Sequence, residues 1–138
     1  MKLLIAFKIW IIAVAVNTIL GTAWLTHFFT DKGAIAEFIF WGIVFGMMAS
    51  FPIFLLLIFI IHQNVSKNRD GKTIFRHVLL AGFISSAIMF VAFFYCCSFV
   101  NEDLVLFLNT LIASFLAVLS QKKNLLKLGY VAIEFETI

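Results

Sequence analysis

The chain alternates between long apolar runs and short polar stretches, and only one polar stretch is long. That stretch is HQNVSKNRDGKTIFRH, residues 62–77, and it separates two halves that are otherwise almost wholly apolar. The apolar runs cover residues 3–25, 34–61, 78–100 and 104–121. A run of about 23 residues makes a helix roughly 34 Å long, enough to cross a hydrocarbon core about 30 Å thick. The pattern therefore predicts four transmembrane helices arranged as two hairpins.

Two of these runs depart from the length of a simple span. The run 34–61 has about 28 residues, or roughly 42 Å of helix, so it must tilt, bend or begin within the interface. Pro52 supplies a cause for a bend, because proline removes a backbone donor and clashes with the preceding turn. The fourth run becomes polar near its end, and we expect its helix to continue past Gln121 while Lys122 and Lys123 reach the interface. Local thinning of the bilayer is the alternative.

The last segment, residues 122–138, changes character. From residue 129 onward, apolar Val131, Ile133 and Phe135 alternate with Glu134 and Glu136, which is the period of a strand. This pattern predicts either an extended tail that pairs with a partner's sheet edge or a frayed, unpaired end.

Composition supports membrane insertion. Hydrophobic residues make up 64% of the chain and charged residues 12%, whereas soluble proteins average roughly 45–50% and 25%. We therefore expect one polytopic membrane domain over residues 1–138. The lipid bilayer is its expected surroundings, and no nucleic-acid partner is implied.

The positive charges are distributed unevenly between the two predicted sides. Lys32 alone lies on one side, and eight residues lie on the other: Lys2, Lys67, Arg69, Lys72, Arg76, Lys122, Lys123 and Lys127. Cytoplasmic loops of membrane proteins carry such an excess of Lys and Arg. The fold class we predict is thus an all-α membrane protein, an antiparallel four-transmembrane-helix bundle with both termini cytoplasmic, and the bacterial inner membrane is the expected location.

Small and polar residues recur at four-residue spacing within the predicted helices. The sharpest seam is Gly42, Gly46 and Ser50, and a second consists of Gly82 and Ser86. Small residues let helices approach closely in lipid, so these seams predict contacts either within the bundle or with a second copy of the chain.

Two asparagines are predicted to lie at a similar depth. Asn17 in the first run and Asn109 in the fourth both fall in the outward-facing third of their helices. A hydrogen bond between them would join these two helices within the membrane.

Few residues suggest catalysis or metal binding. The adjacent Cys96 and Cys97 lack a metal-ligand or redox spacing, and we interpret them as small apolar residues. An acidic rim is expected on the outer side, formed by Asp31, Glu37, Glu102 and Asp103 beside His27. In the central stretch, His62 and His77 are interpreted as interfacial polar residues. We expect no catalytic residue, cofactor or bound metal.

Two functions remain open. The first is a non-enzymatic accessory, assembly or protective (immunity-like) subunit that acts through helix–helix contacts with a membrane-protein partner. The alternative is a small homo-oligomeric channel or transporter, which the glycine seam and Pro52 favour. The basic residues of the central stretch, Lys67, Arg69, Lys72 and Arg76, set the orientation and offer a cytoplasmic contact surface.

Overall fold

The computed structural model describes residues 2–25, 32–96 and 103–134. Over these residues the chain is entirely helical apart from short turns, as predicted. The described residues form five helices: α1 (Lys2–Leu25), α2 (Lys32–Ser66), α3 (Gly71–Cys96), α4 (Asp103–Ser120) and α5 (Lys122–Glu134).

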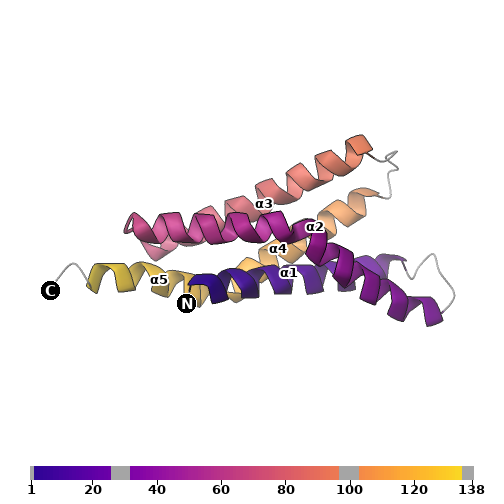
Figure 1. The fold of residues 1–138 in the computed structure, drawn as a ribbon, viewed down its shortest axis with the longest axis horizontal. Coiled ribbons are helices and arrows are strands. Elements are labelled where there is room, and N and C mark those ends of the chain that lie inside the picture. Colours follow the sequence, from indigo (N-terminus) through magenta and orange to yellow (C-terminus); the bar gives the residue numbers. More distant parts are fainter. Residues whose placement is uncertain (1, 26–31, 97–102, 135–138) are drawn as a thin grey trace.

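Successive long helices run in alternating directions along the long axis of the molecule (Figure 1). The N-terminus, the turn between α2 and α3, and helix α5 lie toward one end. The end of α1, the start of α2, the end of α3 and the start of α4 lie toward the other. The two ends therefore divide the chain as the distribution of basic residues predicts.

Within the described residues, three helices are long and apolar enough to cross a membrane: Lys2–Trp24, Ile35–Ser66 and Gly71–Ala92. A fourth crossing exists if Leu104–Ser120 and Lys122–Gly129, which meet at an angle of 54°, count as one broken span. These three to four candidate spans indicate a multi-pass membrane protein.

The prediction that the fourth helix continues past Gln121 is wrong for an unbroken helix, although helical structure does resume at Lys122. The chain breaks at this residue, and α5 leaves at 54° to α4. Gln121 itself is buried, and its side chain accepts a 2.8 Å hydrogen bond from the Asn124 amide. Polar groups thus stabilise the corner, because a buried amide needs a partner.

The strand-like interpretation of the tail is also wrong as far as Glu134, where α5 ends; residues 135–138 lie outside the described part. Leu125 and Leu128 are three residues apart and both buried, whereas Lys127 is exposed. Leu125 and Leu128 follow the helical period, and their packing against the other helices favours a helix. The strand-like alternation after residue 129 does not change this outcome as far as Glu134.

Only a small part of the central polar stretch, residues 62–77, forms a loop. Helix α2 extends to Ser66 and α3 begins at Gly71, so the turn spans only residues 67–70. Hydropathy marks where a helix leaves the lipid, and these two helices extend beyond that boundary.

The end of α2 is a Schellman motif. Asn68 adopts a left-handed conformation with φ of 50°, and its amide donates to the Val65 carbonyl at 3.1 Å. The Arg69 amide donates to the Asn64 carbonyl at 3.0 Å. These two bonds satisfy the last carbonyls of the helix and reverse the chain.

The start of α3 is capped by Asp70, whose carboxylate accepts a 3.1 Å hydrogen bond from the Thr73 amide. A hydrogen bond with the Thr73 side chain, followed by the bond with its amide, lowers the pKa of Asp70 below its ordinary value, and the charge of Lys72 lowers it further. An ionised carboxylate is the form that caps the helix.

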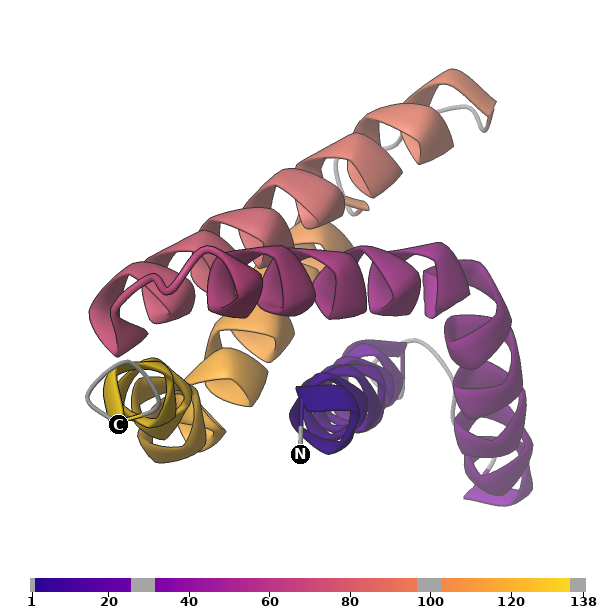
Figure 2. The ribbon, with the colours of Figure 1, turned by 60° about the vertical axis from the view of Figure 1, so that its left-hand side comes forward.

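Helix α2 is bent partway along its length, so its first half turns away from α3 (Figure 2). Pro52 lies inside α2 and is the expected cause, because it leaves one backbone hydrogen bond unmade. The two halves of α2 thus point in different directions.

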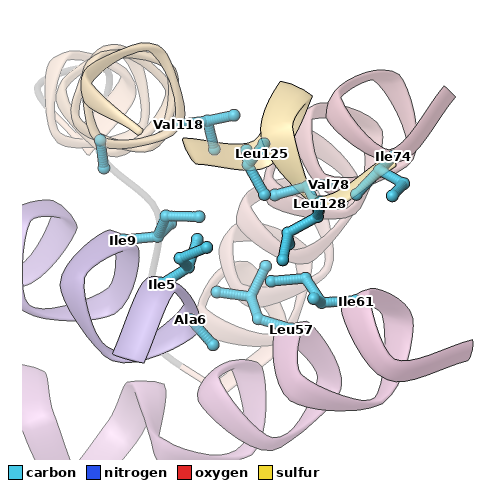
Figure 3. Close-up of a cluster of buried hydrophobic side chains, with 11 residues drawn as sticks. Ile5, Ala6, Ile9, Leu57, Ile61, Ile74, Val78, Val118, Leu125 and Leu128 are labelled. Carbon is cyan, nitrogen blue, oxygen red and sulfur yellow. The ribbon is translucent and has the colours of Figure 1, made fainter. Parts of the chain in front are cut away.

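The main cluster of buried side chains joins all five helices near the end that carries the α2–α3 turn (Figure 3). It contains Ile5, Ala6 and Ile9 of α1, Leu57 and Ile61 of α2, Ile74 and Val78 of α3, Ala117 and Val118 of α4, and Leu125 and Leu128 of α5.

Two glycines bring α5 against the first turn of α3. A Cβ atom at Gly129 would overlap the backbone nitrogen of Gly71, and one at Gly71 would overlap the carbonyl oxygen of Leu126. The two backbones are therefore in direct contact, which only glycine at both positions allows.

Candidate functional site

Beside the buried cluster, a cavity of about 380 Å³ lies among α1, α2, α3 and α4. Ile9, Leu57 and Val118 belong both to the cluster and to the lining, so the cluster closes one end of the cavity. Most of the lining is apolar. Its polar members are all uncharged: Asn17, Thr18, Ser50, Ser86, Thr110 and Ser114.

One wall of the cavity is the close contact of α1 with α2. A Cβ atom on Gly42 would lie 2.9 Å from the Thr18 methyl carbon, and one on Gly46 would lie 3.3 Å from Val14. The predicted seam on α2 therefore faces α1 of the same chain, which supports internal packing for these glycines.

Ser50, the third member of this seam, connects the same two helices. Its hydroxyl donates to the Gly46 carbonyl and accepts a 2.8 Å hydrogen bond from the indole nitrogen of Trp10. The Trp10 ring also stacks on Phe54, with centroids 5.0 Å apart. Together these contacts set the rotation of α2 about its axis relative to α1.

The opposite wall is the contact of α3 with α4. A Cβ atom on Gly82 would lie 3.6 Å from Ser114, an ordinary contact distance. The Ser86 hydroxyl donates to the Gly82 carbonyl at 2.9 Å and lies 3.1 Å from the Ser114 hydroxyl. Gly82 and Ser86 therefore also face a helix of the same chain.

The cavity reaches the molecular surface between α2 and α3. Ala49 of α2 and Met89 of α3 line it and are exposed, Met89 by 42%. The first half of α2 and the second half of α3 diverge in this region (Figure 2). Both residues lie within candidate spans, so the opening lies at membrane depth.

The predicted asparagine pair is not joined by a hydrogen bond among the interactions of the described residues. Asn17 lines the cavity, whereas Asn109 is half-buried outside the lining. Pairing of the two side chains stays a prediction. A double-mutant cycle with Leu at both positions measures it, and a coupling energy near zero contradicts it.

The four basic residues of the central stretch lie on either side of the turn and are all exposed: Lys67, Arg69, Lys72 and Arg76. Lys122 of α5 lies near the same region, with its ammonium 5.8 Å from the ring centroid of Phe75 on α3. Helix α5 thus adds basic residues to the end that carries the turn.

A polar contact near the turn was not anticipated from the sequence. The buried Asn64 side chain donates to the Ile60 carbonyl at 2.7 Å, and its oxygen lies 2.6 Å from Nδ1 of His77. His77 therefore connects α3 to α2. The sequence gives one signal for this contact: the two residues are thirteen positions apart, on opposite sides of the turn that joins α2 to α3.

Of the outer acidic residues, Asp31 and Glu102 lie outside the described part, as do His27 and Cys97, and Asp103 is the first residue of α4. Glu37 is described and exposed. Within the described residues, no three histidine, cysteine or acidic side chains gather where they could hold a metal ion.

Comparison of the chain with protein-family models, with curated proteins and with solved structures found no match.

Proposed function

We propose that this chain is a multi-pass protein of the bacterial inner membrane, with both termini in the cytoplasm. We further propose that it acts without catalysis, as an accessory, assembly or protective subunit that binds another membrane protein through helix–helix contacts.

The outward face of α2 carries this proposal. Within its most apolar window, only 6% of α2 is buried by the rest of the chain, against 22% for α1 and 33% for α3. Large exposed side chains recur along α2 at intervals of four and three residues, with Pro52 in register between them: Trp41, Phe45, Met48, Leu55 and Phe59. We call these five side chains the α2 ridge.

Both the spacing and the chemistry of the α2 ridge suit a partner helix. Intervals of four and three residues form the seam along which two helices interlock, and aromatic residues and Met are enriched at the centres of protein interfaces. The rings of Trp41 and Phe45 stack with centroids 5.5 Å apart, which limits the rotamer entropy lost on binding. Gly42 and Gly46 face α1, so the α2 ridge is left as the contact surface for a partner.

Site-specific photo-crosslinking in native membranes tests the proposal. A photoreactive residue at Met48, which is 71% exposed on the α2 ridge, should crosslink to one foreign membrane protein. The matched control is Ile88 of α3, equally apolar and also exposed, which should label lipid alone. Crosslinks to lipid alone at both positions contradict the proposal.

A second arm measures how much the ridge contributes to affinity. Replacing Trp41 and Phe45 with Ala should weaken recovery of the partner in mild detergent by about 30-fold, the effect of losing about 2 kcal/mol at an interface hot spot. The same substitution at Ile88 should leave recovery unchanged.

The cavity favours the second candidate, a small homo-oligomeric channel or transporter, because ligand paths in membrane bundles lie between facing helices. A crosslink from Met48 to a second copy of the chain, together with solute flux in liposomes that hold the purified protein, would favour this function over the accessory one.

A further inference from the structure

We propose that the cavity among α1–α4 is a binding site for an uncharged lipid that carries a hydroxyl group and enters sideways from the bilayer between α2 and α3. This site is separate from the α2 ridge and does not depend on the accessory function.

The size of the cavity suits a small molecule. Its volume is about 380 Å³. This volume lies at the lower end of the roughly 300–1,000 Å³ typical of small-molecule sites.

The position of the opening determines what can enter. The exposed lining residues Ala49 and Met89 lie within the candidate spans Ile35–Ser66 and Gly71–Ala92. A molecule that reaches the opening must therefore already be dissolved in the hydrocarbon region. Apolar cavities remain free of water and take up apolar molecules of matching size.

The absence of charge in the lining excludes ionised head groups. The described lining contains no Lys, Arg, His, Asp or Glu, so a carboxylate or phosphate inside it would be buried without a counter-ion. Burial of an unpaired charge is far more costly than burial of a hydroxyl. The ligand is therefore neutral.

The hydroxyl groups of the lining already donate their protons to other groups, so a ligand that bonds to them must supply a hydrogen-bond donor. The Ser86 proton goes to the Gly82 carbonyl, so Ser114 must donate in its 3.1 Å contact with Ser86. The Thr110 hydroxyl donates to the Phe107 carbonyl at 2.7 Å.

Ser114 and Thr110 each keep lone pairs but no free proton. They lie one turn apart on α4, so together they present a small acceptor surface to the cavity. The Asn17 amide, also in the lining, adds a donor for the oxygen of the same hydroxyl group. A primary or secondary alcohol matches this combination of acceptors and donor, whereas a pure hydrocarbon forms none of these additional hydrogen bonds.

The test uses the purified full chain in lipid nanodiscs and three diazirine probes of equal chain length: a primary alcohol, a carboxylic acid and a hydrocarbon. We expect the alcohol to label peptides that contain Met89 or Thr110, at a level about 3- to 10-fold above the hydrocarbon, as one good hydrogen bond permits. The acid should label them least. Equal labelling by all three probes identifies ordinary filling by lipid and overturns the proposal.

One pair of single variants and one double variant test whether the labelling takes place in the cavity. Ala49→Trp at the opening should abolish labelling, whereas Ile84→Trp, at an exposed position of α3 outside the lining, should not. Thr110→Val with Ser114→Ala should reduce labelling by the alcohol to the level of the hydrocarbon. Size-exclusion profiles and melting curves identify folded variants. Unchanged alcohol labelling in a folded Ala49→Trp protein overturns the proposal.

Discussion

At the scale of single residues, several polar side chains inside the bundle form pairs that connect one helix to another. Trp10 bonds to Ser50, Ser86 bonds to Ser114, and Asn64 lies against His77. An interhelical hydrogen bond in a membrane contributes only about 0.6 kcal/mol. The main effect of these pairs is therefore to set how each helix is rotated relative to its neighbour.

Asp70 provides a pH-dependent prediction at this scale. Its pKa is lowered from 3.8 in the folded protein by the hydrogen bonds with Thr73. Because the folded pKa lies below the unfolded one, the stabilising effect is fully present above the unfolded value. It is lost as the pH falls through the lowered pKa. Unfolding titrations in mixed micelles should therefore show a loss of stability at acidic pH.

The control for Asp70 is Asp70→Asn, which keeps an oxygen to cap α3 but does not titrate in this range. Subtracting the pH profile of this variant from that of the wild type removes the contribution of the other carboxylates. A difference that stays flat down to the lowest pH would show that Asp70 does not contribute through its charge.

At the scale of helices, the sequence predicts the apolar spans well but predicts their ends poorly. The first three runs agree with α1, α2 and α3 because lipid requires long apolar helices. The ends differ because they depend on local chemistry: the Schellman motif at Asn68, the cap at Asp70 and the corner at Gln121. A hydropathy pattern does not contain these signals. The cap at Asp70 could still be predicted, because Asp is a common residue at the start of a helix.

The contact between Gly71 and Gly129 provides the prediction for this scale. Gly129→Ala places a methyl group against the backbone of α3, where no side-chain motion can relieve the overlap. We expect a loss of about 1–3 kcal/mol in the free energy of unfolding, as for overpacked cores. Denaturation in mixed micelles, followed by circular dichroism, measures it.

A matched control exists in α1. A Cβ atom at Gly21 would meet no other described atom within 4 Å. Gly21→Ala should therefore be neutral or stabilise the protein by up to about 1 kcal/mol, the difference in helix propensity. Equal effects at Gly21 and Gly129 would mean that propensity, rather than the contact between α3 and α5, determines the outcome.

At the scale of the whole molecule, the cavity results from features that no single segment encodes. The seam residues Gly46, Ser50, Gly82 and Ser86 are visible in the sequence, and the structure places all four in the cavity lining. Their partners on α1 and α4 depend on how each helix is rotated. The opening depends on the bend in α2 and on its divergence from α3 (Figure 2). Hydrophobic patterning can predict the helices, but it cannot predict the space between them.

The orientation of the molecule in the membrane gives the last prediction. We expect that reversing Lys67, Arg69, Lys72 and Arg76 to Glu inverts part of the population or reduces partner recovery. All four side chains are exposed, so the folding of the helices themselves should be little affected. Of the eight basic residues at this end, only Lys2, Lys122, Lys123 and Lys127 would remain against Lys32, and the excess of basic residues on which the proposed cytoplasmic orientation rests would fall.

Reporter fusions after the C-terminal residue, one active only in the cytoplasm and one active only outside it, measure the orientation of the reversed protein. Two controls separate the sign of the charges from other effects. Exchanging Lys for Arg and Arg for Lys at the four positions keeps the charge and should retain the wild-type orientation. Lys32→Glu removes the only basic residue at the opposite end, so it should leave the orientation unchanged or strengthen it. If the fourfold reversal retains both orientation and partner recovery, residues 67–76 act only as a connection between α2 and α3. The orientation would then depend on Lys2 and the lysines of α5.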